Sequence, residues 1–266
     1  MNLIIESPAN PKIKELVKLR ESSRRRKERG VFFVEGGKDL MALHRAGRRV
    51  EEIYFCSGSD CGSGKNKEVS EFEELGIDII ETSQLAFSKA SYRSAVHGII
   101  GVVRSWEIGL NAESIKGDGP VVVLDDVEKP GNLGAVLRSV EAFGGAGVIL
   151  SDPAVDYFNP NVVRSSRGLI GRIAVSSGSK EEVWEWLKNS GRKIIATSSH
   201  ATRNLGAGPI PSSAAFIFGS EKSGLGEYWR EQMIEWIKIP MKGSASSLNL
   251  NVSVACLLYE YNRAND

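Results

Sequence analysis

The stretch that decides the fold lies near the C-terminus, where residues 239–260 are Ile-Pro-Met-Lys-Gly-Ser-Ala-Ser-Ser-Leu-Asn-Leu-Asn-Val-Ser-Val-Ala-Cys-Leu-Leu-Tyr-Glu. An apolar strand end is followed by a polar loop and then by the start of an amphipathic helix. Glycine and serine leave backbone N–H and C=O groups uncovered, and serine and asparagine side chains donate and accept hydrogen bonds. Such a loop suits a compact polar ligand, although a capped strand–loop–helix connection has the same pattern.

Upstream of this run, apolar strands alternate with helices from about residue 120 onward. Alternation of this kind predicts a parallel sheet covered by helices. Strands are expected at 121–124, 147–150, 171–175, 193–197, 214–218 and 236–239, and helices at 133–143, at 161–168, after Ser179 and from about Val252.

The first candidate site is the strand–turn–helix at 124–139. Asn132 and Arg138 are six positions apart, which is about 240° around an α-helix, so they converge only if Asn132 precedes the helix. At a helix N-terminus, which favours anions, Asn132 could orient a phosphate or a ribose. The alternative is that Asn132 caps the helix and Arg138 pairs with a surface carboxylate. Gly131 and Gly134 do not form the glycine fingerprint of a dinucleotide-binding fold.

A second candidate site follows the predicted strand 214–218, which stops abruptly at Gly219. Ligands of parallel sheets collect at the carboxyl ends of strands. Gly219 would let a ligand approach the backbone, Gly224 permits a turn, and Glu221 could bond a hydroxyl or hold Arg138. A simple turn remains the alternative for this segment alone.

Together, the three segments resemble the signature motifs of the SpoU (TrmH-like) RNA 2′-O-ribose methyltransferases of the SPOUT class. The matching patterns are Asn-x-Gly-x-x-x-Arg at 132–138, Phe-Gly-x-Glu-x-x-Gly-Leu at 218–225 and the strand end and Ser-Leu-Asn within 239–249. The resemblance implies a deep trefoil knot, S-adenosyl-L-methionine as cofactor and methyl transfer to a ribose 2′-hydroxyl, with ribosomal RNA favoured over tRNA. Action on tRNA and a non-catalytic RNA-binding protein are the alternatives, and a nucleotide-dependent oxidoreductase is disfavoured.

The same resemblance assigns roles to individual residues and requires no metal. A free guanidinium, with a pKa above about 12, is a poor base, so the proton acceptor is left open. The family commonly continues Ser-Leu-Asn directly into Val-Ser-Val-Ala, whereas Leu250-Asn251 intervene here. The substrate-facing amide is therefore Asn249 or Asn251, and we expect Asn249. The catalytic candidates are Arg138, Asn132, Glu221, Ser247 and Asn249, and the cofactor-binding candidates are Gly219, Ser220, Ile239, Met241, Ser247 and Leu248.

The N-terminal part of the chain is smaller, also alternates helices and strands, and carries most of the clustered positive charge. Although the net charge is only +1, residues 12–29 are rich in lysine and arginine, which is typical of a solvated helix face or of a phosphate-binding surface. The Ser-Pro-Ala-Asn-Pro start and Val34-Glu35-Gly36 resemble the L30e-like RNA-binding domain that precedes many SpoU domains. We expect an L30e-like domain at 1–106, a linker at 107–118 and the methyltransferase domain at 119–266. The candidate RNA-binding residues are Lys12, Lys14, Arg24, Arg25, Arg26 and Lys27.

Composition limits the remaining possibilities. With 266 residues, 41% hydrophobic and 25% charged, the chain is expected to be globular. It has no apolar run of the roughly 20 residues that span a bilayer and no signal-peptide pattern, so we expect a cytoplasmic protein. The three cysteines and three histidines show neither disulfide nor metal-site spacing. The family resemblance implies a homodimer through the knotted domain.

Overall fold

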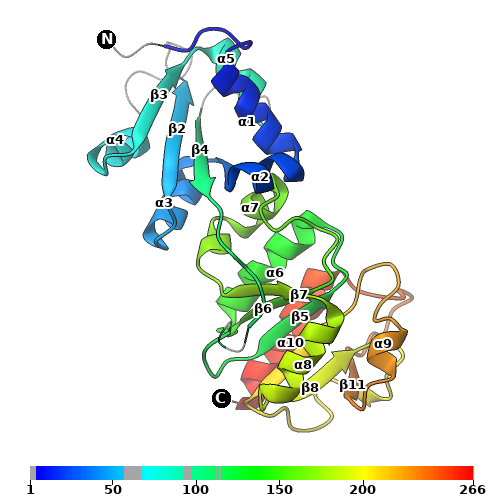
Figure 1. Ribbon diagram of the computed structural model, residues 1–266. Coiled ribbons are helices and arrows are strands. Elements are labelled where there is room, and N and C mark those ends of the chain that lie inside the picture. Colours follow the sequence, from blue (N-terminus) through cyan, green and yellow to red (C-terminus); the bar gives the residue numbers. More distant parts are fainter. Residues whose placement is uncertain (1–3, 57–66, 93–97, 112, 114, 266) are drawn as a thin grey trace. The chain divides into compact units, whose positions relative to one another are not determined.

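The structure is a computed structural model that describes residues 4–56, 67–92, 98–111, 113 and 115–265, so that Cys61 and His97 lie outside the described residues. It divides into two compact units (Figure 1). Unit 1 comprises Met1–Trp106 and Asp156–Arg172, and unit 2 comprises Glu107–Val155 and Ile173–Asp266. The segment 156–172, which the predicted boundaries place in the methyltransferase domain, thus folds with the N-terminal unit.

Unit 1 is built on a four-stranded sheet of order β1-β4-β2-β3, in which β4 is antiparallel to both β1 and β2, and β2 is parallel to β3. The strands are β1 (Val31–Glu35), β2 (Val50–Cys56), β3 (Asp78–Thr82) and β4 (Ile99–Arg104). The helices are α1 (Pro11–Glu21), α2 (Ser23–Arg29), α3 (Gly37–Arg45), α4 (Lys67–Glu74), α5 (Gln84–Ala90) and α7 (Pro160–Ser166), followed by the short 3₁₀ helix η2 (Leu169–Gly171).

The basic run near the N-terminus forms two helices because Ser22 interrupts it. Ser22 has an extended backbone, and its Oγ accepts a hydrogen bond from the Arg25 N–H at 3.2 Å, which caps the start of α2. Gly30, with φ of 63°, ends α2 in the left-handed conformation. The apolar side of α1, formed by Ile13, Leu16 and Leu19, is buried in the core of unit 1.

Unit 2 contains a seven-stranded parallel sheet of order β7-β6-β5-β10-β8-β11-β9, which confirms the predicted α/β class with a parallel sheet. The strand predicted at 171–175 begins later, because η2 occupies 169–171. The short β9 and α9 were not predicted, and the knot stays a prediction. The strands are β5 (Val121–Asp125), β6 (Gly147–Ser151), β7 (Val175–Gly178), β8 (Lys193–Thr197), β9 (Arg203–Asn204), β10 (Ala214–Phe218) and β11 (Glu235–Lys238). The helices are α6 (Pro130–Ala142), α8 (Lys180–Asn189), α9 (Glu227–Arg230) and α10 (Leu250–Asn265).

The strand order of unit 2 positions its loops. All five residues of β10 are buried, and β8 lies between β10 and β11 in the sheet. Because these three strands are parallel, the loops that follow them emerge at one edge. Among the described residues, no helix combines the length and apolar character needed to cross a bilayer.

Candidate functional site

A cavity of about 440 Å³ opens at this edge of the unit 2 sheet. Its lining comes from the loops after β8, β10 and β11, which is where open parallel sheets bind ligands. The volume is within the usual range of small-molecule sites, about 300–1,000 Å³. All the predicted cofactor-binding residues line it, namely Gly219, Ser220, Ile239, Met241, Ser247 and Leu248.

The loop after β10 folds back tightly on itself. The Gly224 N–H donates to the Ser220 carbonyl at 2.9 Å, and the Ser220 and Ser223 hydroxyl oxygens are 2.8 Å apart. A Cβ added to Gly219 would lie 2.1 Å from the carbonyl carbon of Gly224, so the close return of the backbone requires glycine there. Ser220 itself is buried and its hydroxyl is used within the loop.

Three polar side chains from separate parts of unit 2 form a hydrogen-bonded chain beside this cavity. Asn249 Nδ2 donates to Asn132 Oδ1 at 3.2 Å, and Asn132 Nδ2 donates to Glu221 Oε1. The second carboxylate oxygen, Glu221 Oε2, is buried and accepts no hydrogen bond from the described residues. An unpartnered buried carboxylate oxygen is costly, so this atom is suited to accept a hydrogen bond from a ligand.

Asn132 is the third residue of α6, which corrects the expectation that it precedes the helix. Its position in the first turn still lets its side chain reach Glu221 and Asn249. Arg138 lies six residues further along the same helix and is exposed, and the described residues give its guanidinium no hydrogen bond or ion pair. Since six residues correspond to about 240° of rotation, Arg138 is on another side of α6 and is not part of this polar chain.

The two candidate asparagines before and within α10 have different surroundings. Asn249 precedes the helix, and its Oδ1 accepts from the Asn251 N–H at 3.0 Å while its Nδ2 joins the polar chain. Asn251 Oδ1 instead accepts from the Ser139 hydroxyl at 2.8 Å and ties α10 to α6. Ser247 is exposed in the loop that lines the cavity. The geometry thus favours Asn249, whose contact with substrate stays a prediction.

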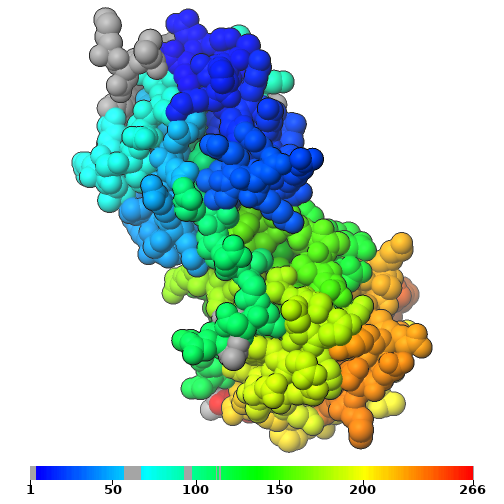
Figure 2. Space-filling model, viewed as in Figure 1, coloured from blue at the N-terminus to red at the C-terminus, as the bar shows by residue number. Residues whose placement is uncertain are grey.

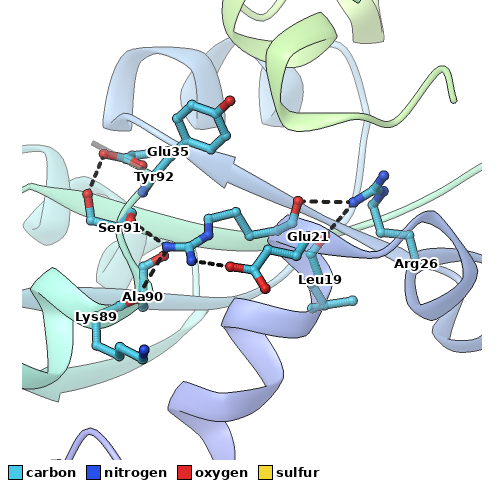
Figure 3. Close-up of polar contacts among 9 residues, drawn as sticks. Leu19, Glu21, Arg26, Glu35, Lys89, Ala90, Ser91 and Tyr92 are labelled. Atoms are coloured by element: carbon cyan, nitrogen blue, oxygen red, sulfur yellow. Dashed lines mark hydrogen bonds and ion pairs between the residues drawn. The ribbon is translucent and has the colours of Figure 1, made fainter. Parts of the chain in front are cut away.

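The structure removes one of the predicted RNA-binding residues in unit 1. Arg26 is only 4% exposed, and its guanidinium lies 2.6 Å from the Asp156 carboxylate. The same guanidinium donates to the Leu19 carbonyl at 2.7 Å (Figure 3). It is therefore a structural residue rather than a phosphate ligand.

The other predicted basic residues differ in their pairing. Lys12 pairs with Glu52 at 2.7 Å, Arg24 with Glu28 at 2.7 Å, and Arg25 with Glu15 at 2.8 Å. Lys14 and Lys27 are exposed and have no carboxylate partner among the described residues. The surface of α1 and α2, blue in Figure 2, therefore has fewer lysine and arginine side chains that are both exposed and free of a carboxylate partner than the sequence predicts.

Sequence reasoning missed the cavity residues that follow β8. Ser198 and His200 line the cavity, and the His200 N–H donates to the Ser198 hydroxyl at 3.2 Å. Their signal was the end of the predicted strand 193–197, since the carboxyl ends of parallel strands meet at one edge.

Comparison with protein families identifies the larger unit. Residues 119–259 match the SpoU rRNA Methylase family. The chain belongs to this family. It is accordingly an RNA methyltransferase that uses S-adenosylmethionine, which confirms the expected enzyme class and cofactor. Residues 10–101 match the MRM3-like substrate binding domain.

Individual relatives of this SpoU methylase extend over nearly the whole chain. It is 29% identical to the 23S rRNA (guanosine(2553)-2′-O)-methyltransferase RlmP of Bacillus subtilis, over 96% of this chain and 97% of that protein. It is 28% identical to the 23S rRNA (adenosine(1067)-2′-O)-methyltransferase of Streptomyces azureus, over 96% and 94% of the two chains. A crystal structure of an RNA 2′-O ribose methyltransferase superposes with a TM-score of 0.85 at 33% identity, covering 99% of each chain.

Proposed function

We propose that the protein transfers the methyl group of S-adenosylmethionine to a ribose 2′-hydroxyl of ribosomal RNA. The observation that carries this proposal is the Asn249–Asn132–Glu221 chain beside the cavity, with the buried acceptor Glu221 Oε2, which has no hydrogen-bond partner among the described residues, at its end. The named relatives act on 23S rRNA, but one methylates a guanosine and another an adenosine. The target nucleotide of this protein is therefore left open.

The residues around the cavity suit the cofactor. Phe218, Leu225, Ile239, Met241 and Leu248 supply apolar surface for an adenine ring. The tight loops after β10 and β11 supply backbone donors and acceptors for its ribose and methionine parts. When bound, S-adenosylmethionine supplies an electrophilic methyl carbon to an attacking hydroxyl.

The side chains beside the cavity would position that hydroxyl and manage its proton. In our proposal Glu221 Oε2 accepts a hydrogen bond from the ribose 2′-hydroxyl, while Asn132 and Asn249 hold the carboxylate in one orientation. Ser247 lies in the adjoining loop and would contact the ribose. Holding reactants in line can contribute roughly 7–11 kcal/mol, so positioning is the main task of these residues.

We further propose that the protein is a homodimer through unit 2. Val252, Cys256 and Tyr259 are exposed and recur at helical spacing on one side of α10, which leaves apolar surface for a partner. A second copy could also use Arg138, which does not reach the polar chain of its own protomer. We also propose that the enzyme works in the cytoplasm, which is where bacteria hold the RNA substrates of this family.

Purified protein with labelled S-adenosylmethionine tests the proposal when ribosomal RNA and tRNA are offered separately. We expect 2′-O-methyl nucleosides in digests of the ribosomal RNA. Label on bases only, or in neither RNA, would contradict the proposed reaction, and label in tRNA alone would support the alternative substrate. Mapping 2′-O-methyl positions in cells with and without the gene would then identify the nucleotide.

The assignment of Glu221 has its own test. Glu221→Gln removes the charge next to Asn132, and we expect its turnover to fall by about 100-fold or more, the usual contribution of proton management. Glu227→Gln, the same change on exposed α9, is the matched control and should keep turnover. Arg138→Ala should lose turnover while binding cofactor normally by calorimetry. Full activity of either site variant would show that the corresponding residue is wrongly assigned.

A further inference from the structure

Tyr92 presents an aromatic ring on the surface of unit 1, shortly after the end of α5. It is 40% exposed, although large aromatic rings are usually well buried. An exposed aromatic ring is a surface on which a planar ligand can stack. The surroundings of Tyr92 determine whether it is available for that purpose.

The backbone that carries this ring is fixed from two sides. The Glu35 carboxylate accepts from the Tyr92 N–H at 2.6 Å and from the Ser91 hydroxyl at 2.9 Å (Figure 3). On the other side, Arg20 Nη1 donates to the carbonyl oxygens of Ala90 and Ser91 at 3.1 and 2.6 Å. Because this segment is already held in place, a ligand that stacks on Tyr92 would lose little free energy to ordering it.

Two residues of α7 extend the surface around the ring. Asn161 Nδ2 donates to the Tyr92 hydroxyl at 2.8 Å, and Arg164 Nη2 donates to Asn161 Oδ1 at 3.2 Å. The guanidinium carbon of Arg164 is 5.4 Å from the centroid of the Tyr92 ring. Arg164 is exposed, so a cation that can bind phosphate lies directly beside the ring.

A cavity of about 420 Å³ adjoins Tyr92 within the same unit. The Glu21 carboxylate lines it and is paired with Arg20 at 2.6 Å through Oε1. A carboxylate can accept a hydrogen bond from an exocyclic amine of a nucleobase. A base inside a duplex is already stacked and paired, so only an unpaired base could enter. The lining residues are Arg20, Glu21, Ser91, Tyr92, Asn159, Pro160 and Asn161.

We propose that this pocket binds an unpaired base of the RNA substrate, which stacks on Tyr92 while Arg164 contacts the flanking phosphate. The inference rests on the proposed function, because it takes RNA as the ligand. It concerns recognition rather than methyl transfer, since the residues that line the cofactor cavity all belong to unit 2. The enzyme would accordingly prefer sites where the RNA is single-stranded near the target.

Binding of a fluorescent 12-nucleotide oligoadenylate and of a 12-base-pair RNA duplex, followed by anisotropy, tests the proposal on the full chain. Tyr92→Leu removes the ring and should weaken oligoadenylate binding about tenfold, in the range expected for loss of one stacked base. Tyr92→Phe loses the hydrogen bond to Asn161 but keeps the ring, and it should stay within about twofold of wild type. Arg164→Gln should weaken binding. It should also reduce the slope of the logarithm of the binding constant against the logarithm of the salt concentration by about 1, as expected for loss of one phosphate contact. Duplex binding should be unchanged in Tyr92→Leu.

Thermal unfolding and cofactor binding of all variants separate recognition from folding. If Tyr92 served only to hold α7, Tyr92→Phe would lose as much RNA affinity as Tyr92→Leu, and the inference would be overturned. Oligoadenylate binding by Tyr92→Leu equal to that of wild type would overturn it as well, while methyl transfer by the wild-type enzyme would still support the proposed function. Failure of the wild-type protein to bind any RNA would overturn both.

Discussion

At the scale of single residues, we expect the buried ion pair between Arg26 and Asp156 to contribute to the stability of unit 1. The side chains are 4% and 14% exposed, and their charged atoms are 2.6 Å apart. Asp156→Ala would leave a buried guanidinium without its partner, which typically costs about 3–5 kcal/mol of unfolding free energy. Urea denaturation should therefore show a large loss of stability.

A matched control for this pair is Glu185→Ala. Glu185 lies 2.6 Å from Lys188, with both side chains more than 40% exposed, and exposed pairs contribute at most about 1 kcal/mol. Equal losses of stability in the two variants would contradict the structural role of Asp156.

Asp39 in the first turn of α3 predicts a pH dependence of stability. Burial raises the pKa of this carboxyl to about 6, against the opposing charge of Arg167. The folded state thus favours protonated Asp39. The free energy of unfolding that this preference adds is fully present below the unfolded pKa of about 3.9 and is lost as the pH rises through about 6. Asp39→Asn should raise Tm relative to wild type at pH 7–8 and change it little at pH 4.

Thermal unfolding at several pH values checks this prediction, with exposed Asp78→Asn as the control. A pH-independent difference between Asp39→Asn and wild type would mean that the carboxyl does not titrate as described.

At the scale of elements, the loop between β10 and α9 is shaped by backbone contacts. In Gly219→Ala the new Cβ would meet the Gly224 carbonyl group at 2.1–2.3 Å, so the loop must shift. Overpacking of this kind typically costs about 1–3 kcal/mol. Because the loop lines the cavity, we expect calorimetry to show at least about tenfold weaker binding of S-adenosylmethionine.

Gly226, at the other end of this loop, offers the control. Its φ is −69°, and a Cβ there would meet nothing within 4 Å. Gly226→Ala should therefore bind the cofactor as wild type does. Normal cofactor binding by Gly219→Ala would remove this loop from the proposed cofactor site.

At the scale of the whole molecule, the exposed side of α10 is where we expect the two copies to meet. A double variant, Val252→Glu with Tyr259→Glu, introduces two like charges per protomer into a surface that a two-fold axis would pair with itself. Light scattering after size exclusion should report a dimer for wild type and a monomer for the double variant. Met233→Glu, which changes a fully exposed methionine elsewhere on unit 2, should remain dimeric.

Two results would contradict this placement. A monomeric wild-type protein would refute the homodimer itself. A double variant that stays dimeric would show that the interface uses another surface.

The sequence by itself determined the class of unit 2 and the segments that surround its cavity. Strand and helix periodicity are local properties, so the parallel sheet followed from the alternation of apolar runs. The end of a parallel strand indicated Gly219 as a ligand-facing position. The resemblance to the SpoU motifs added Met241 and Leu248, and all three line one cavity.

Only the tertiary structure decided which of these groups touch. Arg26 was predicted to bind RNA, but it is buried and paired with Asp156, which is 130 residues away along the chain. Asn132 and Arg138 lie on different sides of one helix and do not meet. Asn249, by contrast, is hydrogen-bonded to Asn132 although the two are 117 residues apart in sequence. The burial and pairing of a polar side chain depend on neighbours brought together by folding, and no local pattern contains them.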